Sequence, residues 1–183
     1  QTLSMDKMRV LARDNLGRGD FEFRVNGQRY TPETFLASHP APQVTALGAG
    51  RMAFSKRGSH FYFQGEMTWH EGSCAMEFMY DTGASDTSIS QSAARRFFGV
   101  EIDDFDLIVQ TASGETRAAR FILPRLVIGD GENGFQFENV PLVVIQDQAD
   151  STPALEIPLF GASLSDLLRV VTMGSDMTFE ASS

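Results

Sequence analysis

The sequence lacks several features on which other classes of protein depend. It has one cysteine, Cys74, so an intramolecular disulfide and a cysteine-based metal cluster are both excluded. One cysteine fits a reducing compartment and an exported protein without disulfides equally well, so the compartment stays open. The sequence has no run of about 18 apolar residues, and we expect no transmembrane helix in this chain. It also shows no signal peptide.

Basic residues are scarce as well. The chain has 15 Lys and Arg against 24 Asp and Glu, which gives a formal net charge of −9. Nucleic acids and anionic membranes bind clustered basic residues, so this balance argues against both partners and for a soluble acidic protein. Apolar residues make up 42% of the sequence and include 15 Phe, enough for a phenylalanine-rich core.

No metal or cofactor site is predicted. The three histidines, His39, His60 and His70, have a spacing that matches no ligand pattern. The 129–134 loop holds acidic side chains but lacks the length and the final Glu of a calcium-binding loop. Cys74 lies among apolar residues of an expected strand, where it is most simply a small buried side chain.

The N-terminal part of the sequence combines helical and hairpin patterns. Apolar residues at helical spacing after a capping Ser4 predict a helix over residues 4–16. Alternating residues on either side of an Asn-Gly pair predict a hairpin over 21–30. Thr31 followed by Pro32 predicts a second, short helix, because Pro suits the first helical position.

A linker follows these elements. Residues 38–50 contain Pro, Gly and Ala without periodicity, which is the composition of a connecting segment. We therefore place a boundary at residue 50. Residues 1–50 are expected to form a small α+β N-terminal segment with its linker, and residues 51–183 the main domain.

The main domain reads as a series of short strands. The expected strands cover 61–69, 74–80, 107–111, 116–123, 126–128, 135–137, 140–145 and a final pair within 170–179, and the apolar residues 155–160 lead into Gly161. Helices are expected over 91–98, capped by Ser90 and ended by Gly99, and from a capping Ser163 to 168. The pattern predicts an all-β fold, a small closed β-barrel with one or two short helices.

One strand of this domain ends in an acid. The strand over 74–80 leads directly to Asp81, which is followed by Thr82 and Gly83. A strand fixes the position of the acid, and a glycine lets backbone and ligand approach closely. An Asp at a strand end is also a common turn residue, so this pattern alone leaves its role open.

The surrounding motifs carry a family resemblance. His60-Phe61-Tyr62 precedes Asp81-Thr82-Gly83-Ala84-Ser85, a hairpin over 107–123 follows, and Leu159-Phe160-Gly161-Ala162-Ser163-Leu164 comes last. In this order they resemble the retropepsin-like aspartic proteases, and most closely the bacterial members. The resemblance covers residues 58–180. The family more often has Leu or Ile where this chain has Phe160, and a larger apolar residue where it has Ala162.

The resemblance implies a fold of retropepsin (acid protease) type and an aspartic endopeptidase. Asp81, Thr82 and Gly83 would be the catalytic residues. Because the chain has one Asp-Thr-Gly, the resemblance implies a homodimer in which each copy supplies one Asp81. The Thr82 hydroxyls would bond across the two-fold axis, and Gly83 would keep the substrate backbone within reach.

The same resemblance implies how a polypeptide substrate would bind. Ala84, Ser85 and Asp86 would line the cleft and accept substrate N–H groups. The hairpin tip, made of Ala112, Ser113, Gly114 and Glu115, would be a flap that closes over the peptide. The substrate would bind in an extended conformation, as an added strand.

Two other interpretations stay open at this point. The chain could have a retropepsin fold without activity and serve as a dimerisation or peptide-binding module, or it could be an unrelated β-barrel. Bacterial members often carry a membrane helix in an N-terminal extension, so we expect a periplasmic or inner-membrane-anchored protein with its anchor outside this chain. Residues 1–50 are a candidate pro-segment, removed by cleavage within 38–50.

Overall fold

The computed structural model describes residues 3–25, 27–70, 72–111, 114–148, 157–173 and 176–182. It contains two compact units, Gln1–Ala41 and Pro42–Ser183, here called unit 1 and unit 2. The division lies before the boundary that we placed at residue 50. Gln43–Leu47, which we expected in a linker, forms strand β3 and pairs with a strand of unit 2.

Unit 1 has the expected mixture of helices and a hairpin. It consists of α1 (Met5–Asp14), β1 (Phe23–Val25), β2 (Gln28–Tyr30) and α2 (Pro32–Ser38). The Ser4 hydroxyl caps α1 by accepting the Lys7 N–H at 3.3 Å, as predicted. Thr31 and Thr34 form a reciprocal capping box at the start of α2. Ala12, Phe23 and Phe35 are buried at the centre of the unit.

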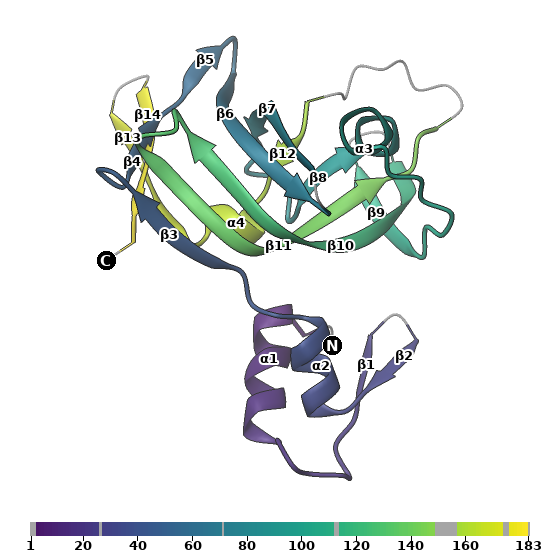
Figure 1. Cartoon of the computed structure of the whole chain (residues 1–183). Coiled ribbons are helices and arrows are strands. Elements are labelled where there is room, and N and C mark those ends of the chain that lie inside the picture. The colour runs from purple at the N-terminus through teal and green to yellow at the C-terminus, as the bar shows by residue number, and fades with distance from the viewer. Residues whose placement is uncertain are drawn as a thin grey trace. The chain divides into compact units, whose positions relative to one another are not determined.

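Unit 2 is built mainly of strands (Figure 1). The described strands are β3 (Gln43–Leu47), β4 (Arg51–Ala53), β5 (Ser55–Arg57), β6 (His60–Trp69), β7 (Gly72–Tyr80), β8 (Thr87–Ser90), β9 (Leu107–Thr111), β10 (Gly114–Gly129), β11 (Gly134–Ile145), β12 (Leu159–Phe160), β13 (Leu168–Met173) and β14 (Asp176–Ala181). The helices are α3 (Gln91–Phe98) and α4 (Ala162–Ser165).

The main sheet of unit 2 closes on itself. Its strands pair in the order β11, β8, β12, β7, β6 and β10, and β10 pairs again with β11. The short strand β12 lies between β7, to which it is parallel, and β8, to which it is antiparallel. β3, β5 and β9 extend the ring by pairing with β11, β6 and β10. The predicted all-β architecture is confirmed.

Two strands are longer than predicted. The residues over 116–128 form one continuous strand within β10, and those over 135–145 form one within β11. The predicted interruption of β10 contains Pro124, which has no N–H to donate. Asn139 of β11 lies opposite this proline, and neither residue belongs to the paired register of the two strands. Asn139 adopts a φ of 54° at this point.

The two helices of unit 2 differ in how they begin. Ser90 caps α3 by accepting the Ala93 N–H at 3.1 Å, and Gly99 ends the helix with a φ of 64°, as predicted. The predicted cap of α4 at Ser163 is wrong, because the helix already begins at Ala162 and has no side-chain cap. Carbonyl groups of a neighbouring loop accept its first N–H groups instead.

The core of unit 2 is rich in phenylalanine, as the composition predicted. Phe78, Phe137, Phe160 and Phe179 are fully buried. The Phe160 ring lies 5.1 Å from that of Phe63 and 5.5 Å from that of Phe179. Aromatic pairs at such distances add to the free energy of burial. The larger side chain at Phe160 is therefore accommodated by neighbouring rings.

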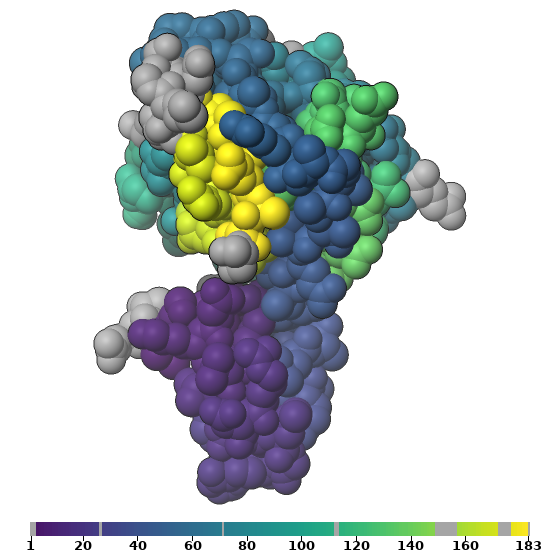
Figure 2. All heavy atoms as spheres, turned by 90° about the vertical axis from the view of Figure 1, so that its left-hand side faces the viewer, coloured from purple at the N-terminus to yellow at the C-terminus, as the bar shows by residue number. Residues whose placement is uncertain are grey.

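A second sheet covers part of the ring. β13, β14 and β4 form a three-stranded antiparallel sheet. Figure 2 shows the C-terminal strands, in yellow, on the surface of unit 2 beside the blue segment that contains β4. Among the residues that the structure describes, no helix is long and apolar enough to cross a membrane.

Asp130, in the turn between β10 and β11, is expected to make the stability of the protein depend on pH. The Asp130 carboxylate accepts the N–H groups of Asn133 at 2.8 Å and Glu132 at 2.9 Å, and these bonds hold the pKa of Asp130 below its usual value. The pKa of Asp130 is therefore lower in the folded protein than in the unfolded chain. The ionised carboxylate stabilises the fold at pH values above the unfolded pKa, and this stabilisation is lost as the pH falls through the folded pKa.

We therefore expect Asp130→Asn to lower the melting temperature of the protein at neutral pH. The difference from wild type should shrink as pH falls from about 7 towards about 3. Thermal unfolding of both proteins across this range measures the effect. A difference in melting temperature that does not change with pH would contradict a stabilising role for the ionised Asp130 carboxylate.

Candidate active site

The candidate catalytic residues lie in the loop between β7 and β8. This loop, residues 81–86 and here called the Asp81 loop, follows β7 directly and leads into Thr87 of β8. In the sheet, β12 lies between β7 and β8, so the loop connects the two strands that flank β12. The Asp81 loop is thus attached to three strands of the closed sheet.

Hydrogen bonds fix the position of Asp81 itself. Its N–H donates to the Phe160 carbonyl at 3.2 Å, which continues the pairing of β7 with β12. Its Oδ1 accepts the Gly83 N–H at 2.9 Å. The residue is half-buried, and Oδ2 makes no hydrogen bond within the described part of the chain. One carboxylate oxygen is therefore held while the other is free to act.

The start of α4 anchors the rest of the Asp81 loop. The Ala162 N–H donates to the Ala84 carbonyl at 2.9 Å, and the Ser163 N–H donates to the Ser85 carbonyl at 2.8 Å. The Gly161 N–H donates to Thr87 Oγ1 at 3.3 Å. These are main-chain N–H groups that a helix leaves unpaired in its first turn. The contacts explain why the two distant motifs occur together in the sequence.

Glycine is required where the two motifs meet. A Cβ on Gly161 would lie 2.3 Å from the Asp86 carbonyl oxygen and 3.0 Å from that of Ala84. A Cβ on Gly83 would lie 3.3 Å from Asp81 Oδ1, a tight contact with the candidate catalytic carboxylate. A side chain at residue 161 would therefore displace the main chain of the Asp81 loop, whereas one at residue 83 would crowd the Asp81 carboxylate.

One charged contact reaches the Asp81 loop from outside the β12 and α4 motif. Arg120 of β10 donates from Nη2 to both carboxylate oxygens of Asp86, at 3.3 and 3.2 Å. The sequence predicted Asp86 as a substrate-binding residue but gave no role to Arg120. The sequence does not indicate this pair, because the two residues are far apart in the chain and β10 is connected to β8 in the sheet through β11.

The remaining predicted site residues fall into two groups. Thr82, Gly83 and Ser85 are exposed, whereas Ala84 is half-buried. At the hairpin tip, Gly114 and Glu115 begin β10, and the Thr111 hydroxyl donates to the Gly114 carbonyl at 2.8 Å. Ala112 and Ser113 lie outside the described residues.

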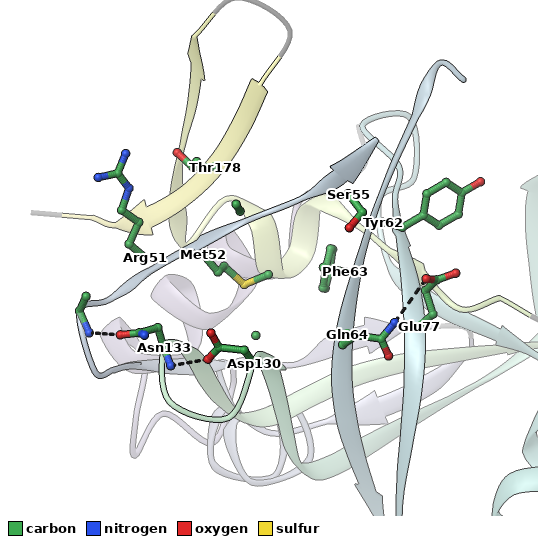
Figure 3. Close-up of a pocket in the computed structure, with 13 residues that line it drawn as sticks. Arg51, Met52, Ser55, Tyr62, Phe63, Gln64, Glu77, Asp130, Asn133 and Thr178 are labelled. Carbon is green, nitrogen blue, oxygen red and sulfur yellow. Dashed lines mark hydrogen bonds between the residues drawn. The ribbon is translucent and has the colours of Figure 1, made fainter. Parts of the chain in front are cut away.

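A pocket lies apart from the Asp81 loop. It has a volume of 590 Å³, and none of its lining residues belongs to residues 81–86 or to the β9–β10 hairpin tip. Figure 3 shows Asp130 and Asn133 on one side of it and Gln64 and Glu77 on the other. Among the described residues, no group of three His, Cys, Asp or Glu side chains is placed to bind a metal ion.

Comparisons with known proteins found solved structures that are similar to this chain. A crystal structure of a retropepsin-like aspartic protease from Rickettsia conorii is similar, with a TM-score of 0.53 and 26% identity, over 70% of this chain and 98% of that chain. The retroviral protease-like domain of Ddi1 from Leishmania major matches with a TM-score of 0.41 and 15% identity, over 67% of this chain and 95% of that domain. None of the curated protein sequences matches significantly.

The family is identified by a direct match to this sequence. The model of the aspartyl protease family matches residues 67–164, which span β7, the Asp81 loop, the β9–β10 hairpin, β12 and the first turn of α4. All the motifs that contact Asp81 lie within this range. The chain therefore belongs to the aspartyl protease family and has its retropepsin-like fold.

Proposed function

We propose that this protein is an aspartic endopeptidase that acts as a homodimer, with one Asp81 supplied by each copy. The observation that carries the proposal is the Asp81 carboxylate. One of its oxygens accepts the Gly83 N–H at 2.9 Å, and the other makes no hydrogen bond within the described part of the chain. Membership of the aspartyl protease family supports the assignment of this group as catalytic.

The chemistry explains why two copies are needed. Hydrolysis of a peptide bond by water requires a base to take a proton from the water and an acid to protonate the carbonyl oxygen. Two carboxylates about 3 Å apart cannot both ionise, so they share one proton and offer one base and one acid. A single Asp81 supplies half of this pair. Thr82, which is exposed, would hydrogen-bond to its counterpart in the second copy.

The other loop residues would position the substrate. In this proposal a polypeptide binds in an extended conformation beside Gly83, and Ala84, Ser85 and Asp86 accept its N–H groups. The hairpin of β9 and β10 would close over it and exclude water. The anchoring of Ala84 and Ser85 by α4 supports this role, because fixed acceptors bind an extended backbone at low entropic cost.

The edge of the small sheet offers a surface for the second copy. Among the described strands, β13 pairs only with β14, so its other edge is free. Val170 on this strand is 38% exposed. A free edge is a ready template for pairing with another chain, and two identical edges can pair about a two-fold axis. β13 also follows α4 closely in sequence, which keeps this edge near the element that anchors the Asp81 loop.

Concentration-dependent activity tests the proposal. The purified protein is incubated with a mixed peptide library between about pH 4 and 7, products are identified by mass spectrometry, and oligomeric state is measured by sedimentation. Because the pair forms only in the dimer, activity per chain should rise over the concentrations at which dimers form. Absence of cleavage where the protein is fully dimeric would instead favour a peptide-binding module without activity.

A further inference from the structure

The ion pair between Arg120 and Asp86 is unusual among those of the described residues. Its two side chains are 32% and 30% exposed, whereas each of the other pairs has at least one side chain that is more than half exposed. A partly desolvated pair interacts more strongly than one at the surface. Removing either partner should therefore leave the other with an effective net charge.

The pair also has a fixed position. The main chain of Asp86 cannot move towards α4, because its carbonyl lies against Gly161. Arg120 lies on β10, the strand that leaves the β9–β10 hairpin tip. The contact thus joins the Asp81 loop to the hairpin that would cover the substrate. If the proposed function holds, an extended peptide passes this point.

Arg120 has N–H groups that donate to no acceptor within the described part of the chain. Only Nη2 is used, and Nε and Nη1 donate to no acceptor within the described part of the chain. A guanidinium group has five N–H donors, so three are available to a ligand. Asp86, in turn, has both oxygens on Arg120. The two residues together present a neutral, polar surface.

We propose that Arg120 and Asp86 act as a specificity-determining pair that sets one subsite of the cleft to zero net charge. This inference rests on the proposed function and names the substrate class of that site: peptides with an uncharged side chain at the position beside the pair. A charged side chain there would have to break the pair or remain unpaired, and unpaired charges are a common means of rejecting a wrong partner.

Two single substitutions should change the preference in opposite directions. Arg120→Gln leaves an unpaired carboxylate and should favour a basic side chain, whereas Asp86→Asn leaves an unpaired guanidinium and should favour an acidic one. We expect the ratio of kcat/KM for Lys and Glu peptides to change roughly fivefold to tenfold each way. The double variant should return this ratio to that of wild type.

The peptides share one sequence, selected from the library by cleavage or by binding to Asp81→Asn, and carry Lys, Gln or Glu at each position in turn. Arg120→Lys keeps the positive charge and should leave the preference near that of wild type. The matched control is the pair of Arg95 and Glu101, which meet at 2.8 Å with side chains 53% and 64% exposed. Arg95→Gln and Glu101→Gln should change no ratio. Melting temperatures identify any variant that fails to fold.

Binding separates this inference from the proposed function. The same peptides are titrated calorimetrically into Asp81→Asn and into this variant combined with each pair substitution. If wild type cleaves peptides but the two substitutions do not change the ratio of kcat/KM for Lys and Glu peptides in opposite directions, the specificity role of Arg120 and Asp86 is wrong and the proposed function stands. If nothing is cleaved, the proposed function fails and the binding ratios decide the inference. If no peptide binds either, both are overturned.

Discussion

Asp81→Asn is expected to reduce peptide hydrolysis by about 10²- to 10⁴-fold, the contribution of a positioned acid or base. An amide oxygen can still accept the Gly83 N–H that fixes Oδ1, so the loop should keep its geometry. What is lost is the ability to take a proton from water and to share one with the second Asp81. The rate constants of wild type and variant with one peptide measure the effect.

The control for this substitution is Asp103→Asn. Asp103 is exposed and makes no hydrogen bond or ion pair within the described residues, so the same chemical change there should leave activity unaltered. Melting temperatures and sedimentation should be the same for all three proteins. Equal activity of Asp81→Asn and wild type would contradict a catalytic role for Asp81.

Gly161→Ala is expected to destabilise unit 2 by about 1–3 kcal/mol, the usual cost of overpacking, and to displace the Asp81 loop. The φ of Gly161 is −104°, which any residue can adopt, so the cost is purely steric. The added Cβ would lie 2.3 Å from the Asp86 carbonyl oxygen, which is main chain and cannot rotate away. Denaturant unfolding measures the loss of stability, and activity should fall with it.

Gly72→Ala is the matched control for this second substitution. Gly72 begins β7, and a Cβ there would lie 3.7 Å from the nearest atom, the Trp69 carbonyl oxygen. We expect its stability to equal or exceed that of wild type, because alanine restricts the unfolded chain. If Gly161→Ala were as stable as Gly72→Ala, the close approach of α4 to the Asp81 loop would be in doubt.

The features that the sequence predicted well are set by neighbouring residues. A run of mostly apolar residues that leads into an acid predicted β7, which ends just before Asp81. The caps of α3 depend on Ser90 and Gly99, which act within one turn of the helix. The strand that positions the candidate catalytic residue was therefore visible from sequence alone.

The features that the sequence did not predict depend on contacts between distant residues. Nothing local in Gln43–Leu47 indicates that it pairs with β11, and its Pro- and Gly-rich surroundings suggested a linker. Ser163 resembled a helix cap, but the Asp81 loop supplies carbonyl groups that make a cap unnecessary. Arg120 meets Asp86 only because β10, β11 and β8 lie side by side.

Mixing active and inactive chains tests most directly whether each active site needs an Asp81 from two copies. Wild type and Asp81→Asn are combined at constant total concentration, allowed to exchange subunits, and assayed for peptide hydrolysis. With equal amounts, about one quarter of the dimers contain two wild-type chains. We predict that activity falls to about a quarter of that of pure wild type and follows the square of the wild-type fraction. A linear decrease, to about half, would contradict the shared site.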